Sequence, residues 1–191
     1  IKGAVDLVLR EVAGPLTEKQ IHYITRVRSN TQHLAGLIND LLDLSKIESG
    51  RIDANSSRVS LAGLVHEVME TLRPVAVEKL IALEASIIEP SILVWADRDK
   101  VHQVLTNLIG NAIKFTPAQG TVAVSVEKNS SEGVRVSVSD TGPGIPPLEK
   151  EKIFDKFYQI AQVGETKPRG TGLGLSICKA LLELQGEKIC V

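Results

Sequence analysis

The first fifty residues carry apolar side chains at the spacing of an amphipathic helix. The pattern stops at Ala13-Gly14-Pro15, which is a turn by composition. A first helix is therefore predicted to end there. Its apolar face is formed by Val5, Val8, Leu9 and Val12.

A second helix is predicted to begin after Thr17 and to run to about Ile47. Thr17 followed by Gln20 three positions later is a capping-box pair, in which each side chain bonds the other residue's backbone N–H. Apolar residues then recur every three or four positions, as in the seam of a coiled coil or helical bundle. The positions of this seam are Ile24, Val27, Thr31, Leu34, Ile38 and Leu41.

A two-helix hairpin cannot bury such a seam by itself. A four-helix bundle made by two copies of the chain is the simplest solution, so a homodimer is predicted. The alternative is a hairpin that packs against its own second domain.

Residues 51–59 are polar and rich in turn-forming side chains, and a domain boundary is expected there. Residues 1–50 then form the helical hairpin, and residues 60–191 form a second domain.

The second domain mixes helical and strand patterns. A helix is predicted over 60–73, ended or kinked at Pro74. Short apolar runs follow at 82–87 and 92–95, and another helix is predicted over 98–115.

A β-hairpin is the clearest element of this domain. Valines alternate with smaller or polar residues on both arms, so an antiparallel sheet with one buried face is predicted. With helices packed on that sheet, the fold class is α+β, a helical hairpin followed by an α/β sandwich. The alternating valines are Val122, Val124, Val126, Val134, Val136 and Val138.

Composition excludes several classes of function. The net charge is −1, with 22 basic and 23 acidic residues, and aromatics make up 3% of the chain, which argues against a nucleic-acid-binding protein or a basic membrane-surface protein. Cys178 and Cys190 have no metal-type or disulfide-scaffold spacing, so a reducing, cytoplasmic setting is expected. Because Ile1 enters in the middle of a helical pattern, we expect the chain to be a fragment of a longer protein.

The stretch Asp140-Thr141-Gly142-Pro143-Gly144-Ile145 follows the second arm of the hairpin. An ionised carboxylate only accepts hydrogen bonds, so it favours the amino group of adenine over the carbonyl of guanine. Glycines let the backbone come close to a base. An ordinary turn is the alternative.

A glycine-rich segment, Gly170-Thr171-Gly172-Leu173-Gly174-Leu175, leads into an apolar helix over 175–184. Free backbone N–H groups and the positive end of the helix dipole make such a junction an anion site. It matches neither the Walker A loop nor the dinucleotide fingerprint. A flexible loop before a helix is the alternative.

Two asparagines and a lysine share one face of the helix over 98–115. Asn107 and Asn111 are four positions apart, and Lys114 lies one turn further on. A carboxamide oxygen suits Mg²⁺, and Lys114 could contact phosphate. Hydrogen bonding between packed helices is the alternative role for the asparagines.

The order of these signals resembles the nucleotide-binding boxes of sensor histidine kinases, a branch of the gyrase–Hsp90–kinase–MutL ATPases. The asparagine box corresponds to residues 102–116, the following boxes to DTGPGI (140–145), FDKFY (154–158) and GTGLGLSI (170–177), and LLDLSKIESGR (41–51) to the end of the second dimerisation helix. The resemblance covers essentially the whole chain.

The resemblance implies a bound ATP and Mg²⁺, with Asn111 as the metal ligand and with Asn107 and Lys114 as catalytic residues on the phosphate side. Asp140 would bind the adenine amino group, and a mobile lid would span about 158–170. The implied nucleotide-binding set is Asn107, Asn111, Lys114, Phe115, Asp140, Gly142, Gly144, Ile145, Phe154, Lys167, Arg169, Gly170, Thr171, Gly172, Leu173, Gly174 and Leu175. Phe157 would anchor the lid together with Phe154.

ATP-hydrolysing members of the superfamily carry a glutamate one turn before the magnesium asparagine, as a base for water. Asn107 stands there in this chain and cannot take up a proton at neutral pH. The site is therefore expected to position ATP for an acceptor other than water.

The chain departs from the family pattern in three places. None of the four histidines stands in an acceptor box, so the acceptor is expected upstream of Ile1. Gln159 replaces an arginine common in the family, which implies one phosphate contact fewer. The chain also stops at Val191, before the family's final strand.

The function implied is that of a sensor histidine kinase core, which transfers the γ-phosphoryl group of ATP to a histidine and then to an aspartate of a response-regulator receiver domain. Nothing in the residues shows a membrane anchor. One alternative is a hydrolase or serine kinase of the same superfamily. Another is a non-catalytic, dimeric nucleotide-sensing module.

Overall fold

The computed structural model divides the chain into two compact units, residues 1–49 and residues 50–191. Each unit is described by itself. The residues that the structure describes are 2–12, 14–49, 55–89, 91–128, 133–160 and 170–191.

The first unit is a helical hairpin of α1 (Lys2–Leu9) and α2 (Glu18–Glu48). The predicted capping box at the start of α2 is confirmed. The Thr17 N–H donates to Gln20 Oε1 at 2.8 Å, and the Gln20 N–H donates to Thr17 Oγ1 at 3.4 Å. These two bonds satisfy backbone donors that the first turn of a helix leaves without a partner.

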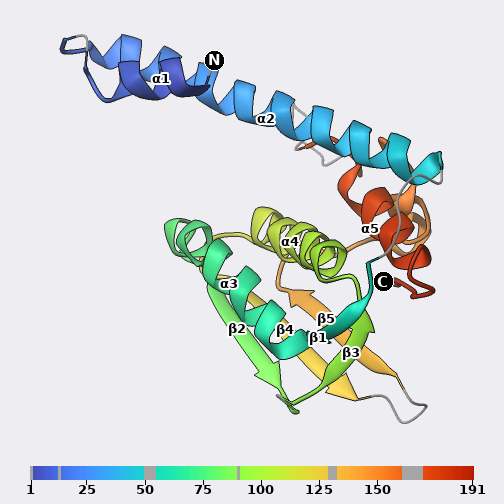
Figure 1. The fold of residues 1–191 in the computed structure, drawn as a ribbon. Helices are drawn as coiled ribbons and strands as arrows, with labels where there is room; N and C mark the ends of the chain where they lie inside the picture. The colour runs from blue at the N-terminus through green and yellow to red at the C-terminus, as the bar shows by residue number, and fades with distance from the viewer. Residues whose placement is uncertain (1, 13, 50–54, 90, 129–132, 161–169) are drawn as a thin grey trace. The chain divides into compact units, whose positions relative to one another are not determined.

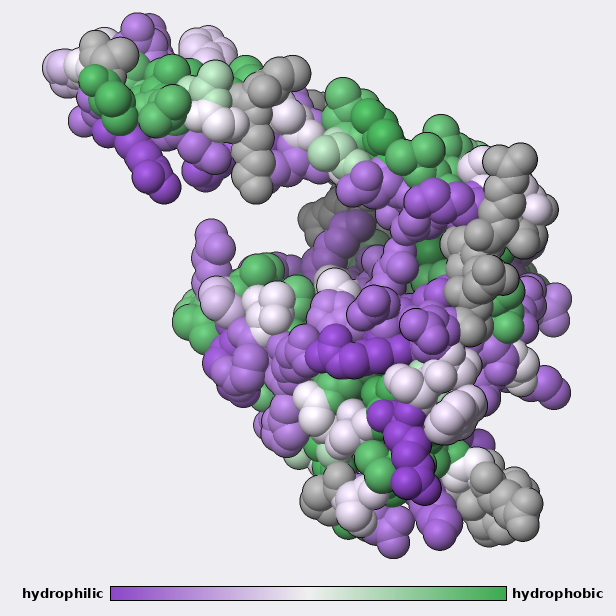
Figure 2. Space-filling view, viewed as in Figure 1, coloured by the Kyte–Doolittle hydropathy of each residue, from purple (hydrophilic) through white to green (hydrophobic). Residues whose placement is uncertain are grey.

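The seam of α2 lies on the surface of this hairpin. Val27, Leu34, Ile38 and Leu41 are between 48% and 58% exposed. Figure 2 shows green, apolar surface along the helical unit. A short α1 is therefore not enough to cover the apolar face of a 31-residue helix.

The described residues of the second unit form three α-helices, α3 (Leu61–Glu78), α4 (Arg98–Phe115) and α5 (Gly174–Glu183). Ser60 caps α3 by accepting the Gly63 N–H at 3.2 Å. Asp97 caps α4 by accepting the N–H groups of Asp99 and Lys100. The predicted helix over 98–115 is confirmed.

Of the two alternatives at Pro74, an end of the helix is wrong, because α3 continues to Glu78 with Pro74 inside it. Proline removes one N–H from the helical ladder, a cost that tertiary packing can offset. Here the turn after Pro74 carries Ala76, which is 1% exposed and belongs to the core.

The main sheet consists of β2 (Ala82–Ile87), β4 (Thr121–Lys128) and β5 (Val134–Asp140) in the order β2-β4-β5. The predicted β4–β5 hairpin is confirmed, with Val124 opposite Val138. The sheet is not purely antiparallel as predicted, because β2 runs parallel to β4. A parallel pair needs a long connection between its strands, and β3 and α4 provide it.

A second, two-stranded sheet pairs β1 (Ser57–Ser60) with β3 (Leu93–Ala96). The predicted linker over 51–59 therefore overlaps a strand. Only Val59 of β1 is buried, so the sequence shows no alternation there. The strand exists because it pairs with β3.

Helices α3 and α4 cover one face of the main sheet (Figure 1). The core between them includes Val122, Val124 and Val126, each fully buried. Two short 3₁₀ helices, η1 (Pro147–Glu149) and η2 (Lys152–Phe154), follow β5. The predicted α+β class is confirmed.

Among the helices of the described residues, none combines the length and apolarity that a bilayer crossing requires.

Candidate functional site

Helix α4 forms one wall of the candidate site. Its buried side, with Val104, Leu105 and Ile109, packs into the core, which fixes the direction of the opposite side. Asn107 and Asn111 are only half-buried, and both lie beside the start of α5.

Gly174 is the residue of α5 that faces the two asparagines. A Cβ placed on Gly174 would lie 3.6 Å from Asn107 Oδ1 and 4.0 Å from Asn111 Nδ2. The first turn of α5 has no side-chain cap, because Leu173 at the N-cap position offers none. Both carboxamides therefore lie next to backbone N–H groups at the positive end of a helix, an arrangement that suits an anion.

Lys114 lies beside the glycine-rich segment. Its ammonium would stand 2.6 Å from a Cβ on Gly170, so a larger residue there would displace it. The same ammonium lies 4.8 Å from the centroid of the Phe115 ring. Gly170 also has φ +129°, a conformation that L side chains rarely adopt.

The carboxyl end of α4 meets the predicted adenine site. The Phe115 carbonyl oxygen would lie 3.2 Å from a Cβ on Gly142. The Gly142 N–H donates to Asp140 Oδ1 at 2.8 Å, which orients the carboxylate. Asp140 is the last residue of β5 and is exposed, so its second oxygen can accept a ligand's amino group.

Gly144 and Ile145 continue this side of the site. Gly144 has φ +72°, and a Cβ on it would meet nothing within 4 Å. Position 144 therefore requires glycine because of its backbone conformation, and not because neighbouring atoms leave no space for a side chain. Ile145 is half-buried.

The residues on either side of 161–169 are joined by two hydrogen bonds. The Phe157 N–H donates to the Gly172 carbonyl at 2.9 Å, and Gln159 Nε2 donates to the Gly170 carbonyl at 3.0 Å. Gly172 and Phe157 both have positive φ, +72° and +64°, and their backbones are in contact. Gln159 thus bonds the glycine-rich segment.

Phe154 lies at the end of η2 and is half-buried, whereas Phe157 is exposed. The next residue, Tyr158, donates its hydroxyl hydrogen bond to the Glu149 carboxylate. That bond, together with burial and the nearby negative charge, raises the pKa of Tyr158. The hydrogen bond also connects Tyr158 to η1, which contains Glu149.

Three predicted positions of the glycine-rich segment are described besides its glycines. The Thr171 hydroxyl accepts the Leu173 N–H at 3.1 Å, Leu173 is buried, and Leu175 is half-buried. The predicted phosphate contacts Lys167 and Arg169 lie outside the described residues.

Lys79 supports the site and was not predicted. Its ammonium donates to the carbonyls of Ile113, Lys114 and Thr116 at 2.7, 2.9 and 3.0 Å. These carbonyls lie at the end of α4, where a cation is favoured by the helix dipole. The two segments are more than thirty residues apart in sequence, so no local pattern could reveal the contact.

Within the described residues, no cluster of three or more His, Cys, Asp and Glu side chains could hold a metal ion. A Mg²⁺ that travels with nucleotide phosphates needs only one or two protein oxygens, and it retains waters. The half-buried Asn111 carboxamide, next to a helix N-terminus that suits phosphate, fits such a role.

Two protein families match the chain. Residues 96–191 match the family described as histidine kinase-, DNA gyrase B- and HSP90-like ATPase. Residues 1–50 match the His Kinase A (phospho-acceptor) domain.

Similar proteins and structures agree with these matches. The circadian input-output histidine kinase CikA of Synechococcus elongatus is 39% identical over 98% of the chain, which spans 25% of that protein's length. The crystal structure of full-length ShkA in complex with AMPPNP is similar at a TM-score of 0.77 and 34% identity, over 97% of this chain and 38% of that one. The complex of histidine kinase ThkA with the response regulator TrrA is similar at a TM-score of 0.71 and 27% identity, over 97% of this chain and 50% of that one.

Proposed function

The chain belongs to the sensor histidine kinases, and from that premise we propose that it binds ATP·Mg²⁺ in its second unit and delivers the γ-phosphoryl group to a histidine of a dimerisation helix. A receiver-domain aspartate of a response regulator then takes the group from the histidine. The reaction is proposed to occur in the cytoplasm.

The observation that carries this proposal is the placement of two binding regions along α4. In the first region, the Asn107 and Asn111 carboxamides and the Lys114 ammonium lie against Gly174 and Gly170, where backbone N–H groups and positive charge suit phosphates. The second region adjoins the carboxyl end of α4, where Asp140 lies with Gly142 and Phe115 and a hydrogen-bond acceptor suits adenine.

Mg²⁺, when held by the Asn111 oxygen together with phosphate oxygens, would neutralise phosphate charge. Lys114 adds a protein cation on the same side, and the glycines let the backbone approach closely. These residues orient the nucleotide and stabilise charge, which is most of what phosphoryl transfer requires from a protein.

Asn107 directs the reaction away from water. A carboxamide cannot remove a proton, so the position one turn before Asn111 offers no base for hydrolysis. The γ-phosphoryl group is therefore retained until an acceptor histidine, itself a nucleophile, approaches.

Residues 1–50 are proposed to form the dimerisation hairpin. The exposed seam of Val27, Leu34, Ile38 and Leu41 needs a partner, and a second copy forming a four-helix bundle provides one. The ThkA–TrrA complex supports a response regulator as the next partner in the relay.

The test is a phosphate balance with γ-labelled ATP and Mg²⁺. One sample is the chain itself, and the other is the chain with a first-helix segment that carries an acceptor-histidine box added before Ile1. Label bound to protein and free phosphate are both counted, and ATP binding is measured separately by calorimetry.

Acid-labile, base-stable label on the extended chain alone is the expected result. Free phosphate without protein label would make the protein a hydrolase. ATP binding with neither product, in a folded protein, would instead support a nucleotide-sensing module.

A further inference from the structure

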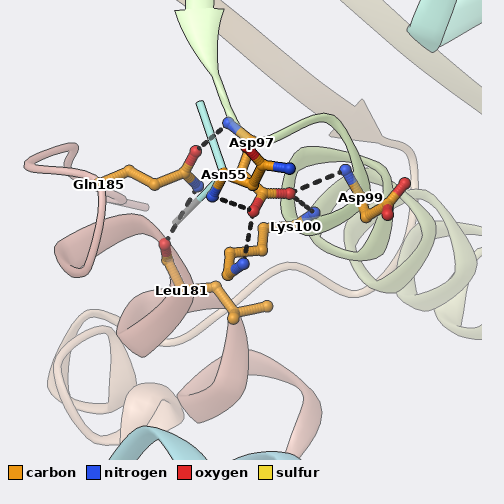
Figure 3. Close-up of polar contacts among 6 residues, drawn as sticks. All are labelled: Asn55, Asp97, Asp99, Lys100, Leu181 and Gln185. Carbon is orange, nitrogen blue, oxygen red and sulfur yellow. Dashed lines mark hydrogen bonds and ion pairs between the residues drawn. The ribbon is translucent and has the colours of Figure 1, made fainter. Parts of the chain in front are cut away.

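The Asp97 carboxylate is a buried junction between distant parts of the second unit (Figure 3). Asp97 is 5% exposed. Its Oδ1 accepts the N–H groups of Asp99 and Lys100 at 3.1 and 3.2 Å, which caps α4. Its Oδ2 accepts the Lys100 ammonium at 2.5 Å and the Asn55 N–H at 2.9 Å.

The backbone of Asp97 extends the junction to α5. The Asp97 N–H donates to Gln185 Oε1 at 2.7 Å, and Gln185 Nε2 donates to the Leu181 carbonyl at 3.2 Å near the end of that helix. The junction thus joins the residues before β1, the start of α4 and the end of α5.

The same two helices form the candidate nucleotide site at their other ends. Halfway along, Cys178 Sγ contacts the Val104 carbonyl at 3.9 Å, and further on Gly174 faces Asn107. Asn107 is ten positions after Asp97, which corresponds to a rise of about 15 Å along the helix. Asp97 therefore holds α4 and α5 together at the ends that lie away from the proposed phosphate site.

A helix cap alone would not need this arrangement. An N-cap uses one oxygen, and serine or threonine would serve equally well. Here the second oxygen holds Asn55, 42 residues away. A buried carboxylate is costly unless its hydrogen bonds are all made, so losing the Asn55 bond should disturb the whole junction.

We infer that Asp97 is a positioning residue, which couples the segment at Asn55, in the predicted linker that follows the hairpin in sequence, to the spacing of α4 and α5 at the nucleotide site. The inference rests on the proposed function in that these two helices bind the nucleotide. A shift of the Asn55 segment would then change nucleotide affinity without contact to the ligand.

The test removes the backbone N–H donor of residue 55. Asn55→Pro lacks the backbone N–H that Asp97 accepts, whereas Asn55→Ala keeps it and loses only an exposed side chain. ATP·Mg²⁺ affinity is measured by calorimetry, and hydrogen exchange is measured in the first turn of α5 and in β4. We expect Asn55→Pro to weaken ATP binding about fivefold and to speed exchange in α5 but not in β4, while Asn55→Ala stays within about twofold of the parent.

A double-mutant cycle separates coupling from general destabilisation. Asp97→Ser keeps a helix cap but is too short to hold Asn55 as well. Asn55→Pro should therefore have no further effect in the Asp97→Ser background. Additive losses, or faster exchange spread equally over α5 and β4, would overturn the coupling.

The inference and the proposed function fail in different ways. If the parent chain binds ATP and Asn55→Pro changes neither affinity nor α5 exchange, the inference is overturned and the function stands. If the parent chain binds no ATP, the proposed function fails, and α5 exchange alone still decides whether the junction positions that helix.

Discussion

Individual side chains determine which reactions the site can support. Asn107 and Asn111 provide amide groups where phosphates are proposed to bind, and Asp140 provides a carboxylate where adenine is proposed to bind. At positions 107 and 97, the behaviour of the protein depends on whether a single group can gain or lose a proton.

Replacing Asn107 by glutamate is expected to create a hydrolase. Asn107→Glu places a carboxylate base where water would have to be activated, so release of free phosphate from ATP should rise by about 10²-fold or more over the parent chain. Phosphate release is measured under saturating ATP·Mg²⁺.

Asn107→Gln is the matched control, because it has the length of glutamate without its basicity. Equal phosphate release by the two variants would show that side-chain length, and not proton acceptance, matters at position 107.

Asp97 is expected to make stability depend on pH in the acid range. Burial raises the pKa of this carboxyl, but the hydrogen bond from Lys100 and the backbone N–H groups of Asn55 and Lys100 outweigh it and hold the pKa below its usual value. Ionised Asp97 therefore stabilises the fold above pH 4, and that contribution is lost as the pH falls through the lower, folded-state pKa.

Asp97→Asn is expected to lower the free energy of unfolding by about 1–3 kcal/mol at pH 7. The difference from the parent chain should shrink as the pH falls below 4, and urea denaturation at several pH values measures it. Lys100 and the exposed Asp99 are the charged groups that the junction includes, and Gln185, just after α5, is neutral. A difference that is constant between pH 7 and pH 3 would exclude this titration.

At the level of elements, α4 carries the two asparagines and Lys114 of the proposed site, and its ends are fixed by side chains outside the helix. Asp97 caps its start, and Lys79, from the end of α3, caps its last carbonyls. The residues that would contact the nucleotide lie between these two anchors.

Lys79→Met is expected to destabilise the second unit by about 1–3 kcal/mol, because it leaves the last carbonyls of α4 without their donor. ATP affinity should fall as well, since Lys114 and Phe115 lie in that turn. Thermal denaturation and calorimetry measure the two effects. Lys79→Arg, which keeps a charged donor, should recover part of both, and no recovery would argue that packing alone matters there.

Gly174→Ala is expected to weaken ATP binding about tenfold with little loss of stability. The added methyl group would stand 3.6 Å from Asn107 Oδ1, an ordinary contact, but it would occupy the space where phosphates approach the first turn of α5. Affinity is measured by calorimetry and stability by urea denaturation.

Gly36→Ala provides the control for helix propensity, because a methyl group there meets nothing within 4 Å and lies in the other unit. It should raise stability by about 0.5–1 kcal/mol and leave affinity unchanged. A similar loss of affinity in both variants would mean that Gly174 has no special place at the site.

At the level of the whole molecule, the chain has one unit with a buried core and one whose longest helix exposes an apolar seam. The unit with the buried core, residues 50–191, is proposed to bind nucleotide as a single chain, and the helical hairpin is proposed to bury its seam against a second copy. Assembly and nucleotide binding should therefore respond to different substitutions.

Ile38→Asp is expected to convert a dimer into monomers, since it places a charge in the seam of α2, where the isoleucine is 51% exposed in the single chain. Light scattering measures the mass, and ATP affinity should stay within about twofold. Gln32→Asp, on the exposed opposite side of α2, should remain dimeric. A monomeric parent chain would instead favour a hairpin that packs against its own second unit.

Local patterns predicted those elements whose sequence signal is complete within a few residues. The capping box at Thr17, the helix over 98–115 and the alternating valines of the β4–β5 hairpin are of this kind. The glycine-rich and asparagine patterns each left a structural alternative open, and it was their order, through the resemblance to sensor histidine kinases, that indicated which residues would form the site.

Only the tertiary structure decided features that depend on partners distant in sequence. The strand β1 exists through its pairing with β3, and α3 continues beyond Pro74 because that turn packs into the core. Lys79 caps α4 because folding brings its ammonium within 3.0 Å of the last carbonyls of that helix. Asp97 joins distant segments because folding brings Asn55 and Gln185 within hydrogen-bonding distance of it. The sequence by itself predicted which side chains could bind a nucleotide, because the chemical type of the residues and the order of their motifs along the chain are visible without a structure. The tertiary structure decided what holds them in place, because hydrogen bonds between segments depend on proximity that no local pattern contains.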